Sequence, residues 1–490
     1  MPLFLVLIGS LMAAPPEPDF ELLLNGRDLE GWTAGGDETG WIVEEDGVLL
    51  TVGTVDGGWL STDREYADFV LRLEYMLSEV GNSGVLIRGL APGSADIEVQ
   101  LLAPWTPYRD DLHCTGSLYG HVAVDPRPDE TTGIWHSLEI TAIGKSLSVV
   151  VDGVEVCRAN TDEVPTLAGS ALSGHIALQS SHSGPEEWVR FRNIRIRDLD
   201  AEPGHLAYQL RSDDPAIRRH AQEFSARLGA AMVPDLLRLH AEGTPESIST
   251  AADALTYIVA GSGRDGSDAT ALSAALAREL AGTWPTPTRA FVLEALALVG
   301  SSACVPAIAA CLDEPVLAHP AASALSRIGG PTAIEALSAA VTGPDLEAAL
   351  AAVSGLSTMG SGSGLHALAS ALGAAIPVLR ASAVTALGSV GTEATAPVIV
   401  AALRDGNPAV RATAHSAVLR LATRLWESDR STAHLLLERA IGAADSRVAR
   451  VSALVAAIRL GADDASPALT LGRARDVEAV EEAERIAQTP

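Results

Sequence analysis

The chain has 490 residues, more than one hydrophobic core usually accommodates, so we expect about two to four domains. Its 62 acidic residues outnumber its 34 basic ones and give a formal net charge of −28, which argues against nucleic acid as a partner. Hydrophobic residues make up 47% of the chain but aromatic ones only 4%, so Ala, Leu and Val dominate, as in packed helices, above all after about residue 205.

The N-terminus resembles an export signal. An apolar run at residues 3–8 is followed by small residues up to Ala14, so we assign residues 1–18 to a signal peptide and a short linker. No Lys or Arg precedes the apolar run and Pro15 would directly follow cleavage, so an uncleaved tether is the alternative. No later segment has the roughly 18 uninterrupted apolar residues of an integral membrane span. We therefore expect an exported protein, periplasmic or extracellular, that is either released or tethered by its N-terminus.

Residues 19–199 have the pattern of a β-sandwich. Short apolar runs alternate with turns rich in Gly, Asp, Asn and Pro. The alternation from Phe69 to Tyr75 predicts a strand with one apolar face, and Asp152-Gly153 between two valine-rich runs predicts a tight hairpin. In the last strand the apolar positions change parity between Phe191 and Ile194, which predicts a β-bulge near Arg192-Asn193.

One predicted strand carries two polar side chains on the same face. In Asp96–Leu102 the even positions are Glu98 and Gln100, whereas the odd positions are apolar. The turn signal Asn82-Ser83-Gly84 leads into a neighbouring run that ends at Arg88. Spacing alone leaves two interpretations, a solvated outer face or the lining of a polar groove.

The four cysteines do not predict a zinc site, because they form no CxxC pair and lack histidines at zinc spacing. Cys114 and Cys157 could form a disulfide in an exported protein. Cys304 and Cys311 lie in or beside a helical pattern and are expected to be small core residues.

The rest of the chain, residues 205–490, is repetitive. The charged segment Asp198–Gly204 is typical of a linker, which we place at residues 200–204. Gly300, Gly329, Gly360 and Gly391 each end an Ala/Leu-rich helical run at intervals of 29, 31 and 31 residues. Such a period predicts an α-solenoid. The repeats resemble HEAT-like repeats, and DGNPAVR at Asp405–Arg411 is similar to their inter-repeat turn, so we expect a surface that docks a protein partner.

Six segments of the β half carry a family resemblance. In order, they are FELLLNGRDLEGW (Phe20–Trp32), NSGVLIRG (Asn82–Gly89), IEVQLL (Ile97–Leu102), TGSLYG (Thr115–Gly120), LQ (Leu178–Gln179) and FRNIRI (Phe191–Ile196). In this order they resemble the signatures of the 3-keto-disaccharide hydrolase (DUF1080) family. The resemblance implies a concanavalin-like jelly roll with a sugar-facing sheet, and an oligosaccharide or 3-keto-glycoside as ligand.

The resemblance also implies a reaction and a set of site residues. A ketone at C3 acidifies the C2 proton, so a base can remove it, expel the C1 substituent and let water add to the enone. The implied catalytic residues are Glu98 as base, Arg88 or a bound divalent cation as enolate stabiliser, and His182 as acid. Metal ligands are not assigned. The implied substrate-binding residues are Asn82, Gln100, Tyr119 and Gln179.

The sequence also departs from the family pattern. His136 stands where the family usually has Asn, Ala103 where an Asp is common, and Gln179-Ser-Ser-His182 is looser than the usual Gln-x-His-Gly. Two other hypotheses therefore stand beside the enzyme. One is a non-catalytic carbohydrate-binding module of the same fold, and the other is a scaffold in which both halves bind protein.

Overall fold

A computed structural model describes residues 19–488 except 37, 54–57, 92–93, 95–96, 107–108, 181–185, 264–265, 361, 363, 463–465. The proposed signal peptide at residues 1–18 lies outside the described residues. The chain divides into two compact units, Met1–Phe224 and Ser225–Pro490. Within the described residues, no helix is long and apolar enough to cross a membrane.

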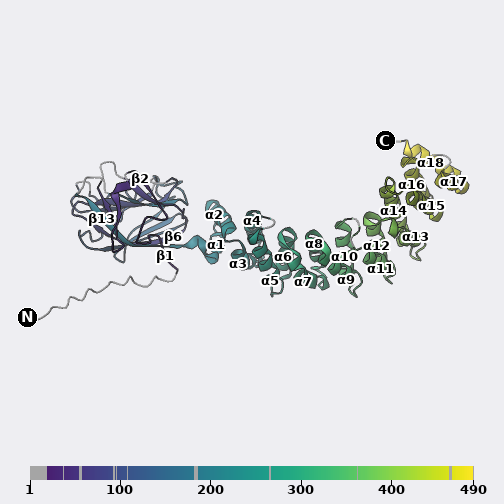
Figure 1. Ribbon diagram of the computed structural model, residues 1–490, viewed down its shortest axis with the longest axis horizontal. Helices are drawn as coiled ribbons and strands as arrows, with labels where there is room; N and C mark the ends of the chain where they lie inside the picture. The colour runs from purple at the N-terminus through teal and green to yellow at the C-terminus, as the bar shows by residue number, and fades with distance from the viewer. Residues whose placement is uncertain are drawn as a thin grey trace, which may run out of the picture. The chain divides into compact units, whose positions relative to one another are not determined.

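The first unit contains two antiparallel sheets that face each other across one core (Figure 1). In the larger sheet, the order is β11 (Val154–Asn160), β10 (Ser146–Val151), β9 (His136–Ile143), β6 (Phe69–Leu77), β13 (Trp188–Asp198), β4 (Leu49–Val52), β3 (Trp41–Val43), with β1 (Glu21–Leu22) also paired to β13. In the smaller sheet, the order is β2 (Trp32–Gly36), β5 (Gly58–Thr62), β12 (His175–Gln179), β7 (Asn82–Gly89), β8 (Ile97–Leu102).

Alternation decides which side chains enter the core. In β6 the residues from Phe69 to Tyr75 alternate between buried and half-buried, and the apolar residues of β8 join them in the same core. Asp152 and Gly153 both have positive φ, 48° and 77°, and form the predicted hairpin between β10 and β11. The register of β13 shifts next to Asn193, whose φ is 52°, so the predicted bulge is confirmed.

The basic residues of β13 form ion pairs on the sheet face opposite the core. Arg190 pairs with Glu44 at 2.9 Å, and Arg192 with Glu74 at 2.6 Å. The Arg192 guanidinium also lies 4.1 Å from the centre of the Trp135 ring. These contacts neutralise the positive charges of the two arginines.

The first unit continues past the sandwich. Residues 200–204, predicted as a linker, contain part of the short 3-10 helix η2 (Leu199–Ala201) and the start of α1 (Pro203–Gln209), and α2 (Pro215–Leu228) follows. The side chain of Asp198 caps η2 by accepting from the Asp200 N–H. Gly144, in the β9–β10 turn, faces Ile217 of α2 so closely that a Cβ there would lie 2.9 Å from Ile217 Cδ1. These helical segments therefore pack against the end of the sandwich.

The second unit is all-helical, and its helices follow one another in stacked pairs (Figure 1). Its helices are α3 (Val233–Ala241), α4 (Pro245–Ser262), α5 (Ser267–Glu279), α6 (Thr286–Val299), α7 (Val305–Ala309), α8 (Ala318–Ile328), α9 (Gly330–Val341), α10 (Leu346–Thr358), α11 (Leu365–Ala371), α12 (Pro377–Val390), α13 (Ala396–Ala402), α14 (Pro408–Leu425), α15 (Arg430–Ala443), α16 (Arg447–Arg459), α17 (Pro467–Arg475), α18 (Val477–Ala487).

The glycine period corresponds to the helix pairs. Gly300, Gly329 and Gly391 are the C-terminal caps of α6, α8 and α12, and Gly360 follows the end of α10. In the predicted inter-repeat turn, Asp405 accepts two hydrogen bonds from Arg380, at 2.8 and 2.9 Å. The predicted fold class, a β-sandwich followed by an all-helical solenoid, is confirmed.

Candidate functional site

The face of the smaller sheet turned away from the core carries polar side chains. Gly84 is paired with Gln100 and Leu86 with Glu98 across β7 and β8, and directly opposed residues of antiparallel strands share a face. The alternate residues, among them Val85 and Val99, are buried in the core. Gln100 donates from Nε2 to Asn82 Oδ1 at 3.0 Å. We call this surface, made by Asn82, Gly84, Glu98, Gln100 and their neighbours in register, the polar face.

Glu98 is the titratable residue at the centre of the polar face. Its side chain is only partly exposed, and burial raises the pKa of its carboxyl to about 7. The missing side chain of Gly84 makes room for it, since a Cβ on Gly84 would lie 2.2 Å from Glu98 Oε1. A carboxyl group with a pKa near neutrality can accept or donate a proton under ordinary conditions.

Tyr119 extends the polar face beyond β8. The Tyr119 N–H donates to the Glu98 carbonyl oxygen at 2.9 Å, and Ser117 and Gly116 make backbone hydrogen bonds to Gln100. Leu118 forms a bridge with the core residue Val99, so Tyr119 lies beside Glu98 and on its side of the sheet. The Tyr119 side chain is 43% exposed.

Gln179 and an aromatic residue lie on the other side of Gly84. Leu178 pairs with Val85, so the register places Gln179 opposite Gly84. On its other edge, Gln179 pairs with Trp59 of β5, which in turn pairs with Gly35 of β2. The sequence analysis missed Trp59, although its alternation with the buried Leu60 indicates that it faces away from the core.

Arg88 is not brought together with Glu98. One extra residue in β7 opposite His175–Ala177 makes a bulge, and Arg88 has a φ of 57°, which turns its side chain off the polar face. Its guanidinium donates to Ala67 O, Gly144 O and Asp68 Oδ1, and its side chain is 1% exposed. This corrects the predicted set, because Arg88 is held in the fold and cannot reach a ligand beside Glu98.

His182 lies outside the described residues. His136 and Ala103, the other two departures from the family pattern, lie within the described residues. His136 is on β9 of the larger sheet, buried, with Nδ1 2.7 Å from Asp152 Oδ2 and Nε2 2.8 Å from Thr131 O. Ala103 directly follows β8, is fully buried and donates its N–H to Gly81 O.

Cys114 and Cys157 are both buried and free, so the structure does not contain the disulfide considered from the sequence.

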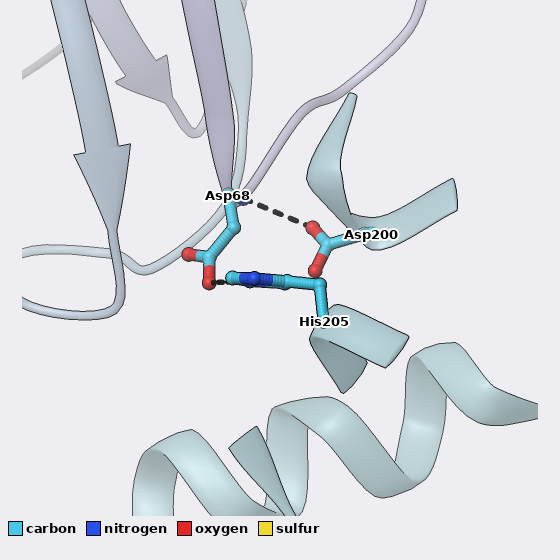
Figure 2. A group of neighbouring side chains, drawn as sticks. All are labelled: Asp68, Asp200 and His205. Carbon is cyan, nitrogen blue, oxygen red and sulfur yellow. Dashed lines mark hydrogen bonds and ion pairs between the residues drawn. The ribbon is translucent and has the colours of Figure 1, made fainter. Parts of the chain in front are cut away.

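A second polar cluster lies where the sandwich meets α1 (Figure 2). Asp68, Asp200 and His205 have ligand atoms within 4.8 Å of one another, the kind of grouping that can bind a cation. Asp68 Oδ2 accepts from His205 Nε2 at 2.8 Å and Gln209 Nε2 at 2.9 Å, and the Asp68 N–H donates to Asp200 Oδ2.

These contacts do not fit a divalent cation. Asp68 Oδ1 accepts from the Gly144 N–H and from Arg88, so both oxygens of Asp68 already have two donors each. The Arg88 guanidinium supplies the positive charge that a metal ion would bring. Burial opposes ionisation of Asp68, but hydrogen bonds from His205 and Gly144 together with Arg88 outweigh it and lower the pKa of Asp68. The cluster is a buried ionic network that ties α1 to the sandwich.

Two segments of the chain match known protein families. Residues 19–197 match the model of the 3-keto-alpha-glucoside-1,2-lyase-like domain, and residues 337–420 match HEAT repeats. Both predicted resemblances are therefore confirmed, and the two domains follow one another in the predicted order. No curated protein matches the chain.

Solved structures are similar to parts of the chain. A provisionally assigned glycosyl hydrolase from Parabacteroides distasonis ATCC 8503 is 24% identical, with a TM-score of 0.33, over 36% of this chain and 98% of that chain. The carbohydrate-binding module CBM66 from Bacillus subtilis is 13% identical, with a TM-score of 0.25, over 34% and 95%. Human deoxyhypusine hydroxylase is 20% identical, with a TM-score of 0.22, over 53% and 95%. At these TM-scores the likenesses carry no functional argument.

Proposed function

We propose that the sandwich cleaves 3-keto-glycosides, with Glu98 as the base that removes the C2 proton. The observation that carries the proposal is the Glu98 carboxyl group, partly buried on the polar face beside Gln100, with its pKa raised to about 7. Such a base is largely ionised just above neutral pH and still basic enough to take an acidified C–H proton. The match of residues 19–197 to the lyase-like domain family supports this reaction class.

The enolate that forms at the C3 oxygen needs a stabiliser, and Arg88 does not reach the polar face. We assign this role to the Gln100 amide and the Tyr119 hydroxyl, or to a bound divalent cation. Gln100 donates one amide hydrogen to Asn82, and its second amide hydrogen would be donated to the ligand. Gln179 and Asn82 would bind the sugar hydroxyls. His182 remains a candidate acid.

The alternative function is sugar binding without catalysis. Trp59 and Tyr119 favour it, because they flank the polar residues of the same face and sugars pack the C–H side of the ring on aromatic side chains. The loss of Arg88 from the face favours it as well, because no described cation then faces Glu98 from β7.

The decisive experiment incubates the full protein with 3-keto-glucosides and their unoxidised parents, with and without added divalent cation, and follows aglycone release. The enzyme hypothesis expects cleavage of the keto forms alone, with Glu98→Gln about 100-fold to 10,000-fold slower. Full turnover by Glu98→Gln would remove Glu98 as the base. Binding of the sugars without cleavage of either form would establish the alternative function.

We further propose that the protein is exported, released or tethered through residues 1–18, and that the helical unit docks a protein partner. The N-terminal run of the sequence supports export, and the match of residues 337–420 to HEAT repeats supports docking. Sequencing the N-terminus of the protein purified from its host tests export, because it shows whether residues 1–18 have been removed. Cross-links to a partner that fall within residues 225–490 test the second, and cross-links confined to the sandwich would contradict it.

A further inference from the structure

A histidine that the family resemblance does not include lies at the edge of the polar face. The His113 ring packs against the Tyr119 ring with 5.0 Å between centroids and an angle of 72°. Tyr119 itself is hydrogen bonded to the Glu98 backbone at 2.9 Å. His113 therefore contacts the residue that lies beside Glu98.

The loop that carries His113 is fixed to the sheet at several points. The Leu102 N–H donates to Thr115 Oγ1 and the Gly116 N–H donates to Gln100 O, at 2.9 and 2.8 Å. Cys114, next to His113, is fully buried in the core. Within the loop, the Gly120 N–H donates to Leu112 O. These bonds hold the histidine in place relative to β8 before any ligand binds.

Asp110 orients the His113 ring. Asp110 Oδ1 lies 2.7 Å from His113 Nδ1 and also accepts from the Leu112 N–H at 3.0 Å. A carboxylate on Nδ1 keeps a proton on that nitrogen, which leaves Nε2 as the atom that exchanges a proton with a ligand. The His113 side chain is 30% exposed, so solvent and ligand can reach it.

We propose that His113, oriented by Asp110, is the acid that protonates the leaving group, the role that the family resemblance gives to His182. The inference rests on the proposed function. Glu98 takes the C2 proton, the electron pair moves to the C3 oxygen, and the enolate re-forms the ketone, makes the C1–C2 double bond and breaks the C1–O bond. The departing oxygen takes the Nε2 proton of His113.

The second half of the cycle restores both groups. Neutral His113 takes a proton from water as that water adds to C1, and the Glu98 carboxylic acid returns its proton to C2. The net reaction is 3-keto-glycoside plus water to 3-keto-sugar plus aglycone, with no oxidant or reductant consumed. One acid and one base, separated by the Tyr119 ring, are sufficient for both halves.

The test varies the leaving group. A 4-nitrophenyl 3-keto-glucoside releases a stable anion and needs no acid, whereas methyl 3-keto-glucoside needs protonation of a poor leaving group. We expect His113→Gln in the full chain to lose about 100-fold or more in kcat/KM on the methyl substrate and less than about threefold on the nitrophenyl substrate. Glu98→Gln should lose activity on both.

Controls separate this role from a structural one. His121, in the same loop, bonds Thr166 at 2.7 Å, and His121→Gln should leave both substrates unaffected. Asp110→Asn, a positioning variant, should likewise lower kcat/KM on the methyl substrate more than on the nitrophenyl substrate. Equal losses on the two substrates in His113→Gln, or no loss, would overturn the inference while leaving the proposed function standing. Wild-type protein that cleaves neither substrate would overturn both.

Discussion

The carboxylate of Glu98 occupies the space that a side chain at position 84 would fill. A Cβ built on Gly84 meets Glu98 Oε1 at 2.2 Å and Glu98 Cδ at 2.9 Å. Both residues lie on regular, paired strands, so the glycine is needed for space and not for backbone conformation. Gly84 thus sets where the Glu98 carboxylate lies.

Gly84→Ala should displace that carboxylate and leave the fold intact, because the clash is with the end of a side chain that can rotate. We expect kcat/KM on a 3-keto-glucoside to fall about 100-fold, the cost of misplacing a reacting group by about 1 Å. Gly35→Ala is the matched control, since its Cβ would meet only Trp59 O, at an ordinary 3.7 Å. Equal activity of the two variants would contradict this role of Gly84.

The pH dependence of turnover should follow Glu98. A base works in its ionised form, so kcat/KM should fall as pH drops through about 7, the raised pKa of Glu98. A pH–rate profile on the nitrophenyl substrate, which needs no acid, isolates this limb. A fall centred near pH 4.5, the ordinary value for Glu, would show that burial does not raise the pKa of the base.

Glu98 should also affect stability, whatever the function. Its folded-state pKa is raised, so its contribution is fully present below about pH 4.5 and is lost as pH rises to about 7. The difference between 4.5 and about 7 corresponds to about 3 kcal/mol. Glu98→Gln should therefore increase the free energy of unfolding, measured in urea, more at pH 8 than at pH 4.5. The two increases should differ by up to about 3 kcal/mol. An effect independent of pH would show that the carboxyl is well solvated.

His136 should make the sandwich less stable at alkaline pH. Burial opposes its charging, but hydrogen bonds to Asp152 and Thr131 O outweigh burial and raise its pKa. Both partners are acceptors, so the folded state favours the doubly protonated ring. Its contribution is present below pH 6.5 and is lost as pH rises through the raised pKa. In thermal melts between about pH 6 and 9, His136→Asn should remove the loss of stability that accompanies rising pH. If the variant loses stability as the wild type does, another group causes the loss.

Asp68 should be among the most sensitive positions of the sandwich. Asp68→Ala leaves the buried Arg88 guanidinium without its charge partner and removes acceptors from His205 and Gln209. Loss of one partner of a buried ion pair costs about 3–5 kcal/mol, measurable by urea unfolding. Glu155→Ala, which breaks an exposed pair with Arg158, should have little effect on stability. Similar costs for the two variants would rule out a structural role for the network.

Local patterns predicted the elements well. Period-two alternation identified β6 and β8 because each has one face in the core, and the parity change at Phe191–Ile194 revealed the bulge of β13. The bulge of β7 was not visible in this way. Val85, Leu86 and Ile87 are all apolar, so a change of parity leaves no trace in the sequence, and nothing local contradicted the family resemblance that implied Arg88 as a site residue.

Long-range partners could not be read from composition. The segment Asp198–Gly204 has the charge and the Pro and Gly of a linker, yet Asp200 bonds the backbone of Asp68, 132 residues earlier. His113 and Trp59 were missed for a related reason. Each is unremarkable in its local sequence, and only the register of β5, β8 and the loop around Tyr119 brings them beside Glu98 and Gln179.

The network around Asp68 sets an order of events during synthesis. The chain emerges from the N-terminus, and Arg88 is made long before His205 and Gln209, which complete the bonds to Asp68. Until α1 has left the ribosome, Asp68 lacks half of its donors and one end of the sandwich remains open. The central strand β13 is complete only at Asp198 and that end can close only after residue 209, so we expect the first unit to mature while the solenoid behind it is already being translated.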